Sequence, residues 1–125
     1  MAARYFTVAE ANALLPQLRA LLSQINDIRD RVNALQPELQ PVLERASSNG
    51  GGKPASDVVV DFQRFEQLVG EIGRLGCLLK DLNYGLVDFP SLRDGREVYL
   101  CWKLGEPEVS FWHDMDAGFA GRQPV

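Results

Sequence analysis

An apolar side chain recurs at every third or fourth residue through the first third of this chain. The steps alternate between four and three from Leu14 to Val42, which is the a/d pattern of a coiled-coil helix over roughly four heptads. Such a stripe must pack against another apolar surface, so it constrains the architecture before any chemistry is considered. The stripe consists of Leu14, Leu18, Leu21, Ile25, Ile28, Val32, Leu35, Leu39 and Val42.

The beginning of this helix has its own signal. Thr7 followed three residues later by Glu10 forms the capping-box pattern, so we expect the helix to begin at this threonine. Two prolines, Pro37 and Pro41, come late in the stripe and each removes a backbone hydrogen bond. Either the helix kinks at Gln36 or a second short helix begins at Pro37, and the unbroken spacing favours the kink.

A second amphipathic segment follows a stretch that is typical of a flexible loop. Residues 47–56 read SSNGGGKPAS, and Phe65, Leu68, Ile72, Leu75, Leu79 and Leu82 then repeat the three-and-four spacing. Two such helices joined by a loop predict a long, coiled-coil-like antiparallel helical hairpin over residues 7–82. A hairpin buries only one face of each helix, so we expect a partner copy to cover the rest and the protein to be a homodimer.

The apolar period changes to two after the hairpin. Arg96 to Leu104 alternates between apolar and polar residues, and Val109 to His113 is predicted as its partner strand. We therefore expect a small antiparallel sheet over residues 85–113 and an irregular segment over 114–125. The chain of 125 residues is predicted to be one α+β domain, 1–125.

Charge is unevenly distributed along the chain. Nine acidic and nine basic residues precede Asp81, and eight acidic and four basic residues follow from there, so the net charge of -4 lies in the C-terminal part. An acidic region without a basic stripe repels phosphate groups, so we expect neither a nucleic-acid nor a membrane partner. The chain has no apolar run of about 20 residues and no secretory signal pattern, so we expect a cytoplasmic protein.

His113 is the one histidine of the sequence, and its position depends on strand register. Pairing Leu104 with Val109 sets Leu100 opposite His113, on the face that packs toward the helices. A register shifted by one residue sets His113 beside Cys101 but leaves an aromatic residue opposite a lysine. The first register matches apolar with apolar side chains and is preferred.

The predicted hairpin brings the beginning of the chain to the sheet. Glu10, Asp81 and His113 are expected to converge there, and Arg122 to join them, as a ligand-binding site. A buried imidazole among carboxylates can bind a divalent metal ion or act as an acid or base. The simpler alternative is a histidine satisfied by a single carboxylate.

Two further acidic residues are candidates for the same site. Asp88 stands among apolar residues, and if it points inward it needs a partner, for which Arg96 or Arg122 is available. If it points outward, it is a solvated strand residue. Glu106 lies in the most acidic segment and is a candidate metal ligand with His113. The spacing matches neither HExxH nor another metal motif, so the metal ligands are predicted from residue type alone.

Three segments resemble one known family. FTVAEANALLP (6–16), KDLNYGLVDFP (80–90) and GREVYLCWKLGEPEVSFWHDMDAGFAGRQPV (95–125) are similar to the bacterial domain-of-unknown-function family 2203. The resemblance implies a small, stand-alone cytoplasmic protein with a helical N-terminal half, and it implies no activity, substrate or cofactor. The matching positions include Glu10, Asn12, Asp81, Gly85, Asp88, Trp102, Glu106, His113, Gly118 and Arg122.

These observations lead to two hypotheses about function. The first is a homo-oligomeric interaction or small-ligand-binding module, because packing explains the helices. The alternative is a metal-dependent or acid–base enzyme with its site around His113 and a divalent metal ion as the candidate cofactor.

Overall fold

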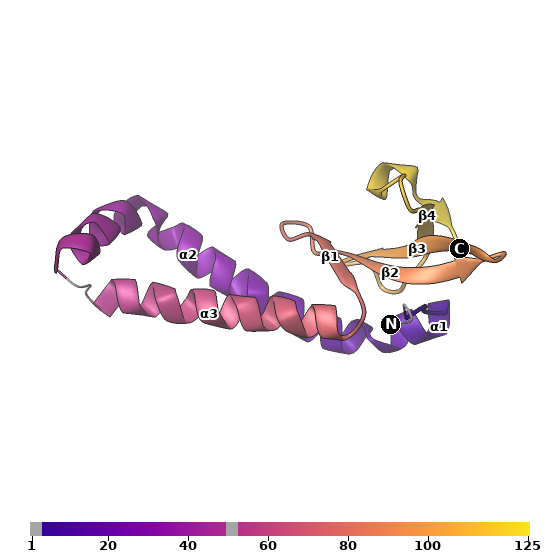
Figure 1. Cartoon of the computed structure of the whole chain (residues 1–125), viewed down its shortest axis with the longest axis horizontal. Coiled ribbons are helices and arrows are strands. Elements are labelled where there is room, and N and C mark those ends of the chain that lie inside the picture. Colours follow the sequence, from indigo (N-terminus) through magenta and orange to yellow (C-terminus); the bar gives the residue numbers. More distant parts are fainter. Residues whose placement is uncertain (1–3, 50–52) are drawn as a thin grey trace. The chain divides into compact units, whose positions relative to one another are not determined.

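A computed structural model describes residues 4–49 and 53–125 of the chain, and the side chains of residues 4–34 and 58–125. In this part of the chain, three α-helices precede a five-stranded antiparallel sheet, which confirms the α+β class (Figure 1). The elements are α1 (Val8–Ala13), α2 (Leu15–Asn49), α3 (Lys53–Arg74), β1 (Leu78–Asp81), β2 (Leu86–Arg93), β3 (Arg96–Lys103), β4 (Phe111–Asp114), a 3-10 helix η1 (Phe119–Gly121) and β5 (Gln123–Pro124).

The chain divides into two compact units. The first unit contains the sheet, α1 and the beginning of α2, and it consists of the residues up to Leu22 and of Glu71–Val125. Ser23–Gly70 form the second unit, which contains most of α2 and α3. Among the described residues, none of the helices combines the length and apolar character that a bilayer crossing requires.

The two long helices do not form the expected coiled-coil hairpin, so this prediction is wrong. Arg31 of α2 contacts Asp61 of α3 at 2.9 Å, and Arg64 donates a hydrogen bond to Gln24. Beyond these contacts the two ribbons separate, and the last part of α2 bends back toward the beginning of α3 (Figure 1). Pro37 and Pro41 lie in this part of α2, and each lacks the amide hydrogen that a straight helix uses.

The heptad stripe is only partly described. Leu18, Leu21, Ile25 and Ile28 are buried as the spacing predicts, whereas the side chains of Leu35, Leu39 and Val42 lie outside the described residues. α2 continues as one helix to Asn49, so no second helix begins at Pro37. The expected loop 47–56 is helical over 47–49 and 53–56, and residues 50–52 lie outside the described part.

The first helix begins as expected and is shorter than expected. The capping box is present, because Thr7 and Glu10 each accept a hydrogen bond from the other's backbone amide. α1 ends at Ala13, and α2 begins after a single intervening residue. Pro16 lies in the first turn of α2, where an amide hydrogen has no partner within a helix and proline is tolerated.

The second long helix ends eight residues before its predicted end, and the residues that follow it form β1 rather than a helical turn. α3 stops at Arg74, and Gly76 adopts a left-handed backbone with φ of 94°. A β-carbon at this glycine would lie 3.2 Å from the Phe6 ring, so both conformation and space favour glycine. Leu79 continues the helical spacing in the sequence but pairs with Val87 in the sheet.

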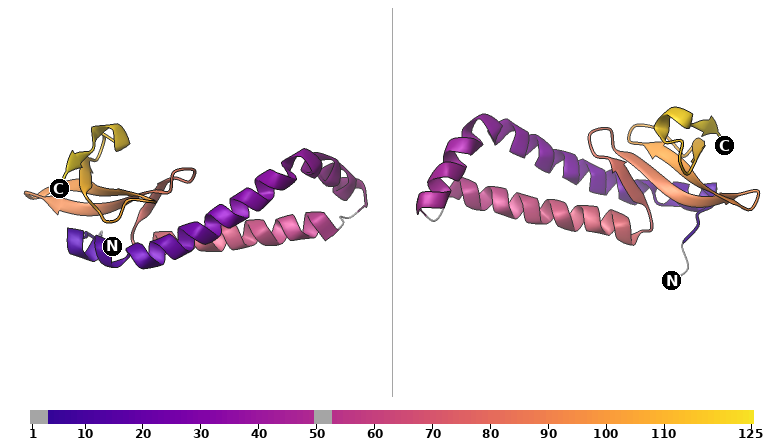
Figure 2. Two further views of the ribbon diagram at one scale, coloured as in Figure 1. Left: turned by 180° about the vertical axis from the view of Figure 1, so that it is seen from behind. Right: turned by 45° about the horizontal axis from the view of Figure 1, so that its top comes forward.

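The sheet is a meander with strand order β1-β2-β3-β4-β5. It extends over 78–124 rather than 85–113, because the end of the predicted helix and part of the predicted irregular segment contribute edge strands. One face carries Val87, Phe89, Val98, Leu100, Trp102 and Trp112, and all of them are buried. This face packs on α1 and the N-terminal part of α2, as Figure 2 shows, with the Phe6 and Phe89 rings edge to face at 5.5 Å.

The predicted register of the last strands is wrong by one residue. Tyr99 rather than Leu100 lies opposite His113, and Leu100 lies opposite Trp112. The expected pairing of Val109 is prevented because its amide donates to the Asn12 side chain at 2.7 Å, so β4 begins only at residue 111. Side chains alternate across a sheet, so this shift moves His113 to the face that points away from the helices.

Candidate functional site

Three metal-ligating side chain types meet on the face of the sheet that points away from the helices. Asp88 of β2 pairs with Cys101 of β3. His113 of β4 pairs with Tyr99, which lies two residues before Cys101 on β3 and therefore on the same face. The carboxylate oxygen, the thiol sulfur and the imidazole nitrogen lie within 4.8 Å of one another. We call Asp88, Cys101 and His113 the DCH cluster.

All three members of the DCH cluster are buried. The exposed fractions are 2% for Asp88, 0% for Cys101 and 2% for His113. The Tyr99 ring lies 5.5 Å from the imidazole, and the Lys80 ammonium group lies 5.1 Å from the tyrosine ring centre. The cluster is therefore shielded from solvent on the side of β1.

The hydrogen bonds of His113 determine its tautomer. Its Nδ1 lies 2.7 Å from the backbone oxygen of Asp114, and its Nε2 lies 3.1 Å from Oδ2 of Asp88. A carbonyl oxygen only accepts hydrogen bonds, so Nδ1 carries a proton and donates it. Nε2 is then the nitrogen that faces the other two members, either as an acceptor or as the donor of an imidazolium ion.

Asp88 has one oxygen without a partner. Oδ2 contacts His113, whereas Oδ1 is buried and lacks a strong donor among the described residues; the Cys101 thiol, a weak donor, is the other group that interacts with this carboxylate. Leaving a buried acceptor unsatisfied costs about 1–3 kcal/mol, and more for a charged group. Such an atom needs an explanation, and a cation bound by the carboxylate would supply one.

The thiol of Cys101 is protonated at neutral pH. Burial, together with the nearby Asp88 carboxylate, raises the pKa of this cysteine to about 12. The guanidinium group of Arg122 opposes this effect and does not overcome it. The thiol is therefore a poor nucleophile without a cation that replaces its proton.

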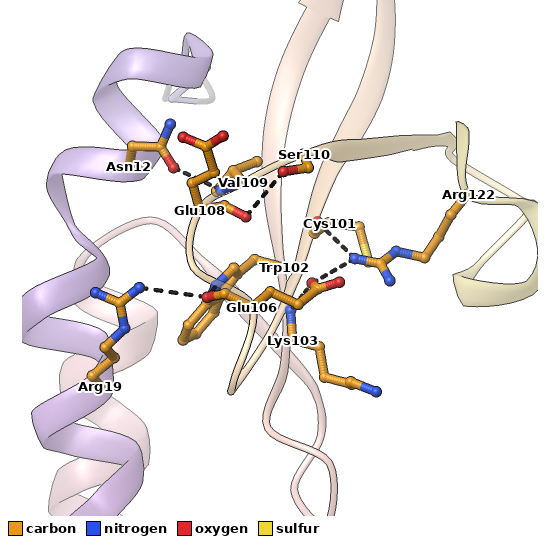
Figure 3. A network of polar contacts seen from close by, with 10 residues as sticks. All are labelled: Asn12, Arg19, Cys101, Trp102, Lys103, Glu106, Glu108, Val109, Ser110 and Arg122. Atoms are coloured by element: carbon orange, nitrogen blue, oxygen red, sulfur yellow. Dashed lines mark hydrogen bonds and ion pairs between the residues drawn. The ribbon is translucent and has the colours of Figure 1, made fainter. Parts of the chain in front are cut away.

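Glu106 holds the loop between β3 and β4 together (Figure 3). Its Oε1 accepts hydrogen bonds from the Lys103 amide at 2.7 Å and from Nη2 of Arg122 at 2.6 Å. Its backbone oxygen accepts from the Trp102 indole at 2.9 Å and from the Arg19 guanidinium at 3.4 Å. Burial alone would raise the pKa of Glu106, but the bonds from Arg122 and the Lys103 amide outweigh it and lower that pKa.

Arg122 connects the C-terminal segment to the sheet. Besides Glu106, it donates to the backbone oxygen of Cys101 at 3.3 Å. Its guanidinium lies 4.1 Å from the ring centre of Phe111 and 4.6 Å from that of Phe119. The arginine contacts the backbone of the DCH cluster and holds Glu106, so both residues have a structural role beside the cluster.

The other predicted site residues lie elsewhere. Glu10 caps α1 by accepting from the Thr7 amide at 2.9 Å, and this bond lowers the pKa of Glu10. Asp81 accepts from the Tyr84 amide at 3.1 Å and shapes the turn after β1. Neither carboxylate belongs to the DCH cluster.

Cys101 is the member that the sequence did not single out as a site residue. The strand alternation places it on the same face as Tyr99, and Asp88 lies directly opposite on β2. The available signal was this pairing of a buried thiol with a buried carboxylate, which becomes visible only once the β2–β3 register is known.

The comparisons with known proteins identify a family. The model of the family described as "Uncharacterized conserved protein (DUF2203)" matches residues 4–125. No curated protein and no solved structure matches the chain. The chain therefore belongs to this family, as the sequence resemblance indicated, and the description of the family specifies no activity.

Proposed function

We propose that this member of the DUF2203 family binds one divalent transition-metal ion, such as Zn²⁺, through the DCH cluster. The observation that carries the proposal is the convergence of three buried ligand atoms within 4.8 Å, one of them on a carboxylate whose second oxygen is unpartnered. Thiolate, imidazole and carboxylate are the ligand types that Zn²⁺ takes in proteins.

The surroundings of His113 support the same function. Metal-binding histidines commonly donate their second ring N–H to a backbone carbonyl or carboxylate, which fixes the ring and the tautomer. Here Nδ1 donates to the carbonyl of Asp114, and Nε2 faces Asp88 and Cys101. Because the Asp114 carbonyl fixes Nδ1, the ring presents Nε2 to the place where the carboxylate and the thiol converge.

Three protein ligands leave one tetrahedral position for a fourth ligand. Structural zinc sites are closed by four protein side chains, whereas catalytic ones use three and leave the fourth position to water or substrate. Among the described residues no fourth histidine, cysteine or acidic ligand joins the cluster. The ligand count therefore favours a metal site that can take a small external ligand.

The decisive experiment measures metal in protein purified without a histidine tag. We expect stoichiometric Zn²⁺ by elemental analysis after equilibration, and a thiolate-to-cobalt absorption band when Co²⁺ replaces it. Cys101→Ser and His113→Ala should each lose the metal, while Cys77→Ser, a second buried cysteine outside the cluster, should keep it.

The alternative is a structural Asp88–His113 pair, to which the cysteine would contribute only packing. In that case the wild type would bind metal weakly and Cys101→Ser would leave the metal content unchanged. That outcome, in variants with native circular dichroism, would overturn the metal proposal.

A second candidate function is self-association. α3 exposes Val59, Val60 and Phe62, with 54%, 61% and 50% of their surface accessible. We propose that a second copy of the chain covers these side chains, which gives a homodimer. Light scattering coupled to size-exclusion chromatography should give the dimer mass for the wild type and the monomer mass for Phe62→Ser.

The net charge of -4 also supports the expectation that the protein has no nucleic-acid partner. A filter-binding assay with mixed single- and double-stranded DNA at low salt should therefore detect no retention.

A further inference from the structure

A cavity of about 370 Å³ lies between the N-terminal segment and the sheet, on the face opposite the DCH cluster. Six of the ten residues that line it are apolar, namely Phe6, Val8, Leu92, Val98, Leu100 and Trp112. The volume is at the lower end of the range for small-molecule sites, and walls of this kind suit an apolar ligand.

Each hydroxyl group around the cavity already has a partner. Thr7 caps α1, and Ser91 donates to the backbone oxygen of Phe6 at 2.6 Å. The Tyr5 hydroxyl is hydrogen-bonded to Glu97. These groups would gain little from a polar ligand, because a new hydrogen bond would have to replace an existing one.

Arg93 is the remaining polar side chain around the cavity. Its guanidinium lies 4.7 Å from the centre of the Trp112 ring, and among the described residues it has no ion pair. Arg96 lies on the same ring at 5.9 Å but is already paired with Asp114 at 3.0 Å. The cavity therefore combines apolar walls with one arginine that makes no ion pair among the described residues, while the Glu97 carboxylate is bonded to Tyr5.

We infer that this cavity binds an aliphatic carboxylate, with the apolar chain against Phe6, Leu100 and Trp112 and the carboxylate on Arg93. Charge complementarity selects the class of ligand. A guanidinium offers two parallel N–H donors to a carboxylate, whereas an ammonium ligand would be repelled and an alcohol would gain no charge-assisted bond.

Octanoate is the probe that tests this inference, with octylammonium and 1-octanol as ligands of matched chain length. We expect calorimetry to detect binding of octanoate and much weaker binding of the other two. Within a series from butanoate to octanoate, each added methylene should tighten binding by about fourfold until the cavity is filled. Equal affinity for the three head groups would overturn the inference.

Arg93→Gln should weaken octanoate binding at least tenfold, because it removes the charge and keeps a polar side chain of similar length. Arg74→Gln, an exposed arginine at the end of α3, is the matched control and should bind like the wild type. Arg93 is exposed, so we expect both variants to fold. Unchanged binding by Arg93→Gln would show that the guanidinium is not the recognition group.

The inference is independent of the proposed metal site. Cys101→Ser should lose the metal and retain octanoate binding, because the two sites lie on opposite faces of the sheet. Conversely, Arg93→Gln should retain the metal. The failure of one proposal would therefore leave the other testable on the same set of proteins.

Discussion

Replacing His113 by alanine should strongly destabilise the metal-free protein. The substitution removes the 3.1 Å contact with Oδ2 of Asp88, whose Oδ1 is already unpartnered. A carboxylate that is 2% exposed would then keep only the weakly donating thiol of Cys101 beside it. Removing one member of a buried pair costs about 3–5 kcal/mol, which is a large part of the 5–15 kcal/mol that stabilises a typical domain.

The assay is urea unfolding followed by tryptophan fluorescence, in the presence of a chelator so that metal does not contribute. His113→Ala should lower the free energy of unfolding by about 3–5 kcal/mol. The double variant Asp88→Ala/His113→Ala should lose less than the sum of the single variants, because it leaves no buried charge without a partner. The expected coupling energy is about 1–3 kcal/mol.

Two results would refute this reasoning. The first is a loss below about 1 kcal/mol for His113→Ala, since that is the cost of an ordinary partly exposed contact. The second is strict additivity of the two substitutions, which would mean that the imidazole does not compensate the carboxylate. Either result would also weaken the argument that the unpartnered oxygen of Asp88 favours a cation.

Three more outcomes are expected. Burial raises the pKa of Cys101 to about 12, so Zn²⁺ must displace the proton of this thiol when it binds. The affinity for Zn²⁺ should therefore rise with pH, and calorimetry in several buffers should detect the released proton. Binding that does not change with pH would contradict this. The pKa of Glu106 is lowered in the folded state, so its carboxylate contributes about 1–3 kcal/mol to the free energy of unfolding above the unfolded pKa of about 4.3. This contribution is lost as the pH falls through the folded pKa. The urea midpoints of Glu106→Gln should therefore lack this part of the acid dependence. Gly85→Ala should cost roughly 2 kcal/mol or more, because its β-carbon would lie 2.7 Å from that of Leu104, whereas Gly95→Ala has open space and should lose only the backbone part in thermal unfolding.

Local signals in the sequence predicted local structure well. The capping box at Thr7 and the strand that begins at Arg96 depend on residues close together in the chain, and both are present. The end of α3 was missed because Leu75 and Leu79 fit a helical period as well as a strand period. The left-handed Gly76 was the better guide, since glycine both ends a helix and admits the Phe6 ring.

The candidate site depended on information that is not local. A shift of one residue in the β3–β4 register decides which face His113 occupies, and the Val109 amide, which the predicted register paired with β3, donates instead to the side chain of Asn12. A contact between residues so far apart in the chain has no signature in the spacing of apolar residues. Residue types therefore indicated His113 and Asp88, while the third member, Cys101, required the three-dimensional pairing.

The hydrogen bond from the Phe6 amide to the Pro90 carbonyl, at 2.7 Å, has a consequence for how the protein behaves in concentrated solution. β1 pairs with β2 only as far as Asp88, so the margin of β2 beyond this point would otherwise offer backbone groups to a strand from another molecule. Pro90 has no amide hydrogen to donate at this margin, and its carbonyl oxygen already accepts the hydrogen bond from the Phe6 amide. The segment around Phe6 thus covers a margin that could otherwise add a strand from another molecule, and a version lacking this segment should form aggregates at concentrations at which the intact protein remains dispersed.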